Sequence, residues 1–168
     1  ERVFDANSGE FKEIDELNAA SFYGFSKVEA EKIVLENKGS IIRIQTMLGV
    51  KNRIVEAVLD AAKGKEYYPF WDNDYLRPSY FPDFFEVIKK ASSGANGIYH
   101  VSCRGKALSR LDIASEVVRL YKENNIPLQK EEFKSESRKE GERRIILNTD
   151  KTQRELGLQF TDSRDALK

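Results

Sequence analysis

The sequence contains few of the residues from which metal sites and disulfide frameworks are built. Cys103 is the single cysteine and His100 the single histidine among 168 residues. One cysteine cannot form an internal disulfide, and it cannot by itself make a structural zinc site. The composition therefore excludes a disulfide scaffold and a multi-histidine metal centre, and we predict no metal site.

An excess of charge of one sign is also missing. Lys plus Arg and Asp plus Glu number 28 each, so the formal net charge is zero. Proteins that bind nucleic acid commonly carry a basic excess. No apolar run approaches the ~20 residues that a membrane span needs. We therefore expect a soluble, cytoplasmic protein that binds neither nucleic acid nor membrane.

What the sequence does contain is an alternation of β-branched runs with segments of helical periodicity. Ser109, with Asp112 three residues later, predicts a variant of the capping box at a helix start. We predict helices over about 19–37, 54–63, 84–92, 110–121 and 150–156, strands over 40–46, 97–102 and 145–147, a surface loop over 6–18, and one short strand within 67–82. This order is typical of an α/β protein with a largely parallel sheet.

One pair of residues carries a chemical hypothesis. Tyr23 and Lys27 stand four positions apart near the start of a predicted helix and therefore share a face. A neighbouring ammonium favours the phenolate and lowers the pKa of a tyrosine. Such a tyrosine can protonate a carbonyl oxygen as hydride reaches its carbon. The spacing alone is weak evidence, because chance produces about 0.7 such pairs in this composition. An exposed tyrosine beside a solvated lysine accounts for the pair more simply.

Segments on both sides of this pair match a set of known motifs in the right order. They are Val3-Phe4-Asp5 with Glu13-Ile14-Asp15-Glu16, Asn18 to Glu31 around Tyr23-Gly24-Phe25-Ser26-Lys27, Ile41 to Gly49, Arg77-Pro78-Ser79-Tyr80 with Asp83, Gly97-Ile98-Tyr99-His100 with Ser109 to Asp112, and Arg144 to Gly157. Together they resemble the extended short-chain dehydrogenase/reductase superfamily, and within it the dTDP-4-dehydrorhamnose reductase group. The resemblance covers essentially the whole chain.

The resemblance implies an α/β fold with two parts. Residues 1–66 would be the C-terminal part of a Rossmann-like NAD(P)-binding domain that carries Tyr-x-x-x-Lys. Residues 67–168 would be mainly a small α/β substrate-binding region. The N-terminal dinucleotide half of the family would be missing, because no three of the ten glycines form the Gly-rich turn that approaches the pyrophosphate.

The resemblance also implies roles for single residues. Tyr23 would be the catalytic acid, and Lys27 would orient the nicotinamide ribose, so that both bind NADP or NAD. Thr46 and Met47 would lie near the nicotinamide, with Thr46 also near the sugar. Arg77 would bind the nucleotide-sugar substrate, although a surface loop arginine is an equally good interpretation.

Other residues have an ordinary interpretation or depart from the family pattern. His100 lies in an apolar strand, where a satisfied core histidine is more common than a catalyst. Ile44, Gln45 and Leu48 differ from the family's Thr, Ser and aromatic residue, which leaves the exact sugar open.

Three functions follow from the resemblance. The first is NAD(P)H-dependent reduction of a nucleotide-linked 4-keto-deoxysugar by a protein that forms a homodimer, with the isolated chain inactive. The second is an NAD-dependent nucleotide-sugar epimerase or dehydratase. The third is a non-catalytic regulatory subunit that resembles the β-subunit of methionine adenosyltransferase, an alternative that the changed residues at 44, 45 and 48 keep open.

Overall fold

A computed structural model describes residues 2–4, 8–49, 53–65, 69–128 and 132–168. Its largest sheet has four strands in the order β1 (Ser8–Phe11), β8 (Arg143–Leu147), β4 (Asp74–Leu76) and β7 (Leu108–Ser109). β8 pairs in parallel with both β1 and β4, and β7 is antiparallel to β4. The α/β fold with mainly parallel strands is therefore confirmed.

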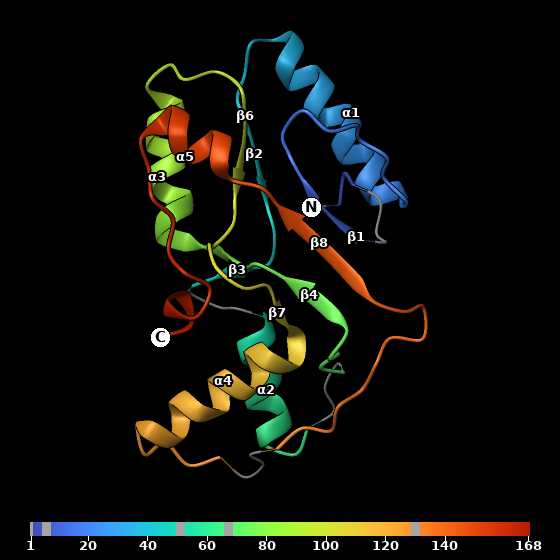
Figure 1. Cartoon of the computed structure of the whole chain (residues 1–168), viewed down its shortest axis with the longest axis vertical. Helices are drawn as coiled ribbons and strands as arrows, with labels where there is room; N and C mark the ends of the chain where they lie inside the picture. Colours follow the sequence, from blue (N-terminus) through green and yellow to red (C-terminus); the bar gives the residue numbers. More distant parts are fainter. Residues whose placement is uncertain (1, 5–7, 50–52, 66–68, 129–131) are drawn as a thin grey trace.

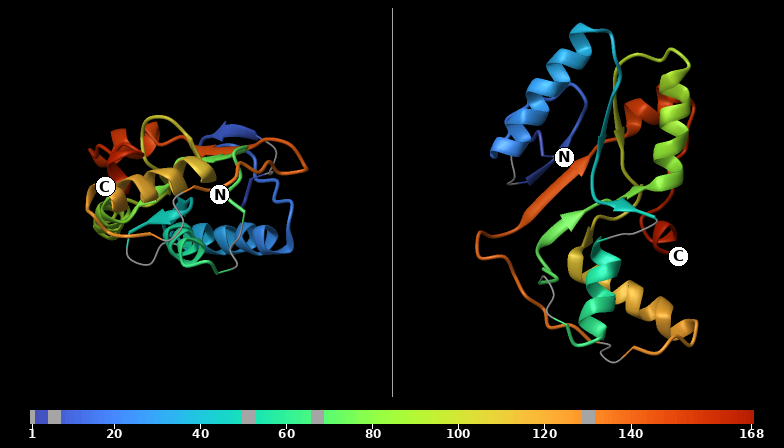
Figure 2. Two further views of the ribbon diagram at one scale, coloured as in Figure 1. Left: turned by 90° about the horizontal axis from the view of Figure 1, so that it is seen from below. Right: turned by 180° about the vertical axis from the view of Figure 1, so that it is seen from behind.

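Two further strand pairs complete the architecture. β2 (Ile41–Ile44) lies parallel to β6 (Ile98–Val101), and β3 (Met47–Leu48) lies parallel to β5 (Ser79–Tyr80). Helix α1 (Phe22–Glu36) lies on one side of the β2–β6 pair. Helices α3 (Phe81–Ser92) and α5 (Asp150–Leu156) lie on the other, as Figures 1 and 2 show from the front and from behind.

Two clusters of buried apolar residues lie at opposite ends of the molecule. At the lower end of Figure 1, α2 (Arg53–Ala62) packs on α4 (Arg110–Glu123) through buried residues such as Val58 and Ile113. At the other end, Val87 of α3 and Leu156 of α5 pack against β6. The chain closes with a short 3-10 helix, η1 (Asp165–Leu167). Among the residues described, no helix is long and apolar enough to cross a membrane.

The helix boundaries follow local signals in the sequence. Helix α4 begins at the predicted capping box, in which Ser109 accepts from the Asp112 backbone while the Asp112 carboxylate accepts from the Ser109 backbone. Helix α5 ends at Gly157, whose φ of 62° is the left-handed conformation that glycine adopts without strain. All five predicted helices are present within a few residues of the predicted bounds.

The predicted loop over 6–18 is wrong at its centre. Residues 8–11 form β1, which pairs with residues 144–147 of β8, more than 130 positions further along the chain. Residues 6 and 7 of that loop lie outside the described part. Likewise, the segment 67–82 holds two short strands, β4 and β5, where one was predicted, and its residues 67 and 68 are not described.

Strand pairing crosses the predicted division at residue 66. β6, from the second part, pairs with β2 from the first, and β8 pairs with β1 in the same way. The assignment of residues 1–66 to a cofactor domain and 67–168 mainly to a substrate-binding region stays a prediction.

The capping box should contribute a measurable amount to the free energy of unfolding. Ser109→Ala removes the side-chain acceptor of the Asp112 N–H, and we expect it to lower the free energy of unfolding by about 1 kcal/mol. Ser115→Ala, in the exposed interior of the same helix, is the matched control and should leave stability nearly unchanged. Urea unfolding of the wild type and of both substituted proteins tests this prediction. Equal losses of stability in Ser109→Ala and Ser115→Ala would contradict it.

Candidate functional site

A groove of about 410 Å³ runs between α1 and β2. Both elements contribute polar side chains to its walls, and the segment before β1 closes one side. Its lining consists of Arg2, Val3, Tyr23, Lys27, Glu31, Ile42, Arg43, Ile44, Gln45 and Thr46. Three cationic side chains against one carboxylate give the groove an excess of positive charge.

The predicted pair meets in this groove. Lys27 Nζ lies 5.2 Å from the centroid of the Tyr23 ring, a cation–π contact between residues one helical turn apart. Tyr23 is 60% exposed and lines the groove. Locally, Ser21 caps the helix by accepting from the Gly24 N–H at 3.0 Å, which starts α1 directly before this pair.

The other predicted site residues are not all in the groove. Thr46, the second residue after β2, lines it together with Tyr23 and Lys27. Met47 begins β3 and pairs with Ser79, and it is not among the lining residues. Arg77 is not among them either, although its backbone N–H donates to the Oε1 atom of the lining residue Gln45 at 3.2 Å.

Arg77 has an incompletely bonded guanidinium. Its Nη1 lies 3.6 Å from the Glu10 carboxylate, and its buried Nε has no hydrogen-bond partner among the described residues. Glu10 in turn accepts from the Asn148 side-chain amide at 3.1 Å. A guanidinium carries five N–H donors, and this side chain is 24% exposed, so it can still donate to an additional oxygen acceptor.

Gln45 has a structural role that the sequence did not reveal. Its backbone N–H donates to Ser79 Oγ at 2.9 Å, and its side-chain amide donates to the carbonyl of Ile145 and accepts from Arg77 N–H. One buried side chain thus joins the end of β2 to β8 and to the segment after β4. The departure from the family's serine is therefore built into the packing of this chain.

Arg43 is a second residue that sequence reasoning missed. Its Nε and Nη2 donate to the two oxygens of the Glu31 carboxylate at 3.0 and 2.7 Å. Nη1 donates to the Glu13 carbonyl at 3.2 Å and lies 3.2 Å from His100 Nε2. The guanidinium also lies 5.2 Å from the Phe4 ring centroid. A charged side chain that is almost fully buried is rare unless it is paired in this way.

His100 is a neutral core residue. Its Nδ1 lies 3.0 Å from the Asn148 carbonyl, which can only accept, whereas the Arg43 guanidinium can only donate. Nδ1 therefore carries the proton and Nε2 accepts. Burial, followed by the charge of Arg43, lowers the pKa of His100 to about 3. The interpretation of His100 as a satisfied core histidine is confirmed.

The lone cysteine offers no nucleophile. Cys103 is buried, and this burial, followed by the charges of Asp83 and Asp162, raises the pKa of its thiol to about 12. The side chain is therefore a neutral thiol at physiological pH. In the described part of the chain, no group of three or more His, Cys, Asp or Glu side chains is arranged to hold a metal ion.

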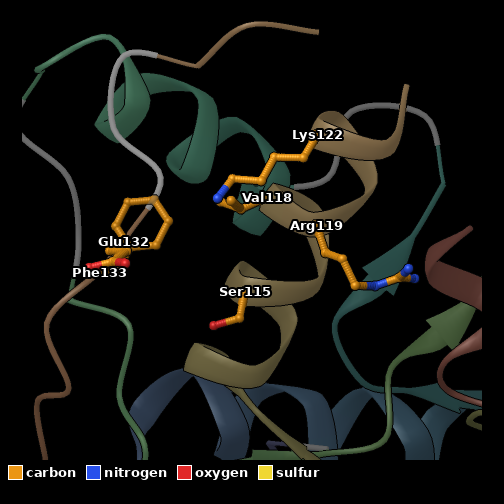
Figure 3. Close-up of a pocket in the computed structure, with 6 residues that line it drawn as sticks. All are labelled: Ser115, Val118, Arg119, Lys122, Glu132 and Phe133. Carbon is orange, nitrogen blue, oxygen red and sulfur yellow. The ribbon is translucent and has the colours of Figure 1, made fainter. Parts of the chain in front are cut away.

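A second pocket of about 420 Å³ lies on α4, at the opposite end of the molecule from α1. Figure 3 shows Ser115 and Lys122 turned toward the Phe133 ring, while Arg119 points away. Arg119 pairs with two glutamates on its own helix. None of the residues predicted from the sequence to act in catalysis or binding lines this pocket, so the groove beside α1 is the candidate site.

Comparison with known proteins agrees with this fold. The model of the RmlD substrate binding domain family matches residues 1–168. Among solved structures, a dTDP-4-dehydrorhamnose reductase from Bacillus anthracis in complex with NADP has a TM-score of 0.81 and 23% identity. A dTDP-4-dehydrorhamnose reductase from Clostridium acetobutylicum has a TM-score of 0.80 and 23% identity. A UDP-glucuronic acid 4-epimerase from Bacillus cereus in complex with NAD has a TM-score of 0.72 and 17% identity.

These alignments cover nearly all of this chain but only part of each relative. They include 99% of this chain in all three cases, against 60% of each reductase chain and 56% of the epimerase chain. The chain therefore spans somewhat more than half the length of the proteins whose fold it shares. No curated protein matches it.

The state of His100 predicts how stability depends on pH. The unfolded chain takes up a proton on this imidazole near pH 6.5, whereas the folded protein keeps it neutral down to about pH 3. The unfolded state therefore binds more protons in this window, and stability is lost as the pH falls through it. Between pH 7 and pH 5 we expect this group to remove about 2 kcal/mol from the free energy of unfolding.

Urea unfolding of the wild type and His100→Gln at both pH values measures this contribution. The substituted protein lacks the titrating group, so its stability should fall by about 2 kcal/mol less over the same interval. The carboxylates titrate in both proteins and cancel in the comparison. Identical pH dependence of the two proteins would contradict a buried, neutral His100.

Proposed function

The chain belongs to the RmlD substrate binding domain family, and on that premise we propose that it is the C-terminal portion of a nucleotide-sugar reductase. The reaction would be the NAD(P)H-dependent reduction of a nucleotide-linked 4-keto-deoxysugar, as in dTDP-4-dehydrorhamnose reductases. The observation that carries the proposal is the placement of Tyr23, Lys27 and Thr46 in one open groove with an excess of positive charge.

Tyr23 is the proposed proton donor. Its exposed hydroxyl can donate to a ketone oxygen that becomes negative as the carbon is reduced. Lys27 contributes the nearby positive charge, at 5.2 Å from the ring, which stabilises the phenolate left after proton transfer. The same ammonium can donate to ribose hydroxyls. Thr46 supplies a hydroxyl on the opposite wall of the groove.

The residues in the groove fit one end of a nicotinamide cofactor, NADP or NAD. A phenol, an ammonium and a hydroxyl line the same groove, and a ribose and a carboxamide would need such donors and acceptors. When bound, the cofactor would supply the hydride. The pyrophosphate needs backbone amides in a Gly-rich turn, and the ten glycines of this sequence form no such turn. We therefore propose that a preceding dinucleotide-binding segment completes the site.

Arg77 is the proposed contact to the nucleotide part of the substrate. Its side chain is 24% exposed and its Nη1 lies 3.6 Å from Glu10, beyond hydrogen-bond distance, so N–H donors remain for a phosphate oxygen. The bond from its backbone to Gln45 places this segment beside the groove. Met47, at the start of β3, stays a candidate for the nicotinamide side on sequence grounds alone.

An NAD-dependent epimerase or dehydratase of nucleotide sugars is the second candidate. The similarity to the Bacillus cereus epimerase, with a TM-score of 0.72, supports it. A regulatory subunit without catalysis was kept open by the changed residues at 44, 45 and 48. It is a weaker candidate, because one of these residues, Gln45, has a role in packing. The homodimer and the cytoplasmic location stay predictions from the sequence.

Removal of the Tyr23 hydroxyl tests the proposed acid. In a protein that joins this chain to a dinucleotide-binding segment, we expect Tyr23→Phe to lower kcat by roughly 10²- to 10⁴-fold, because the ketone oxygen loses its proton donor. Tyr121→Phe on α4 removes a hydroxyl outside the groove and serves as the control. Turnover is measured by NADPH absorbance with a dTDP-4-keto-6-deoxysugar. Unchanged turnover in Tyr23→Phe would remove this residue from the mechanism.

The fate of the cofactor separates the two enzymatic candidates. A reductase consumes one NADPH for each sugar reduced, whereas an epimerase returns its NAD unchanged and isomerises the sugar. We expect stoichiometric loss of NADPH, with the reduced sugar as product in chromatography. Isomerised sugar without net consumption of NADPH would favour the epimerase and contradict the reductase.

A further inference from the structure

Helix α1 is not held in place by an apolar stripe. Its buried residues are Gly24 and Glu31, and one partly buried apolar residue, Val28, packs against the cluster of Val3, Phe4 and Leu147. Large apolar side chains instead face solvent, with Phe22 89%, Phe25 57% and Ile33 61% exposed. A helix on the surface of a protein is ordinarily oriented by an apolar face about 100° wide. Val28 alone does not supply such a face, so within this chain the rotation of α1 about its axis depends mainly on polar and backbone contacts.

The first of these contacts is at Gly24. A Cβ atom at this position would lie 2.2 Å from the Arg2 carbonyl oxygen and 2.9 Å from Ala19 Cβ. Because Gly24 has no side chain, the N-terminal segment can cross the helix at this turn. Only the glycine face of this turn can therefore lie against that segment. Gly24 directly follows Tyr23 in the sequence.

The second contact is the ion pair of Glu31 with Arg43. Both carboxylate oxygens are engaged, at 3.0 and 2.7 Å, and both side chains are largely buried. A bidentate pair is directional in a way that apolar contact is not. Arg43 is itself fixed on β2 by the Glu13 carbonyl and the His100 ring. A rigid partner therefore holds Glu31 from the side of the sheet.

These contacts adjoin the two proposed catalytic groups, because Gly24 follows Tyr23 and Glu31 stands one helical turn after Lys27. Tyr23, Lys27 and Glu31 stand at i, i+4 and i+8, so they lie along one face of α1. All three line the same groove. A rotation of the helix that separates Glu31 from Arg43 must also turn the other two side chains relative to β2.

We infer that Glu31 is a positioning residue: its bidentate pair with Arg43 sets the rotation of α1 and thereby aims Tyr23 and Lys27 into the groove. The functional part of this inference rests on the proposed reductase activity. The structural part concerns only the seam between α1 and β2. A small misplacement of a catalytic group costs a large factor in rate, because the reacting atoms must be aligned.

The matched test compares two glutamates of the same helix. Glu31→Gln removes one negative charge and the bidentate pair, whereas Glu29→Gln removes the same charge from a side chain that is 44% exposed and pairs with Lys32. Nuclear Overhauser effects between the Val28 methyl groups and the Val3, Phe4 and Leu147 side chains, against which Val28 packs, report the rotation of α1 directly. We expect Glu29→Gln to keep them and Glu31→Gln to lose them.

Because Glu31→Gln leaves Arg43 buried without a charge partner, it can fail to fold. The double variant Glu31→Leu/Arg43→Met replaces the pair by apolar side chains of similar size, an exchange that buried ion pairs often tolerate. Glu31→Asp keeps the charge but shortens the side chain, and it provides a third folded comparison. Circular dichroism and the melting temperature establish which variants are folded.

We expect the folded variants at position 31 to lose the contacts of Val28 with the Val3, Phe4 and Leu147 side chains. In the protein with its dinucleotide-binding segment, we expect kcat to fall roughly 100-fold, with KM for the nucleotide sugar unchanged. A folded double variant that keeps both the contacts and the wild-type kcat would overturn the inference. The contact measurement needs no reaction, so it tests positioning even if Tyr23→Phe leaves turnover unchanged.

Discussion

The buried guanidinium of Arg43 is the contact on which the arrangement of the upper half of the molecule depends. It joins β2 to α1 through Glu31, to the segment after β1 through the Glu13 carbonyl, and to β6 through His100. Removing one partner of such a buried pair costs about 3–5 kcal/mol, since the remaining charge is left unpaired. The cost of an unpaired charge in this position restricts these elements to one mutual arrangement.

The network continues on the far side of the β2–β6 pair. Thr152 of α5 donates to the Glu13 carboxylate at 2.9 Å and accepts from the His100 backbone N–H at 2.8 Å. The His100 ring then donates to the Asn148 carbonyl at the end of β8. Polar contacts therefore link helices on both sides of the strand pair, and the candidate groove lies where α1 meets this network.

Much of the fold could be predicted from local signals. The helices α1 to α5 follow from apolar periodicity and from capping residues such as Ser109 and Gly157, which act within a few positions along the chain. β1 could not be predicted, because Ser8–Phe11 has no strand pattern of its own and is a strand only by pairing with β8. A pairing partner more than 130 residues away cannot be recognised from the few neighbouring residues that a local sequence pattern includes.

The candidate site likewise contains residues that the sequence predicts and residues that only the structure reveals. Tyr23, Lys27 and Thr46 were brought together by a motif and by its resemblance to a family, and the structure places them in one groove. Glu31 and Gln45 were not predicted, because a charged or amide side chain in a sequence is ordinarily a solvated one. Their importance comes from burial and from partners on other elements, which only the folded chain supplies.

The most direct test of the account is where a nucleotide sugar binds. We predict that a crystal structure with a bound dTDP-4-keto-6-deoxysugar, in the protein with its dinucleotide-binding segment, places the ketone oxygen within about 2.6–3.2 Å of the Tyr23 hydroxyl. The sugar would then occupy the groove between α1 and β2. A sugar bound in the α4 pocket, or in the groove with its ketone turned away from Tyr23, would contradict the account.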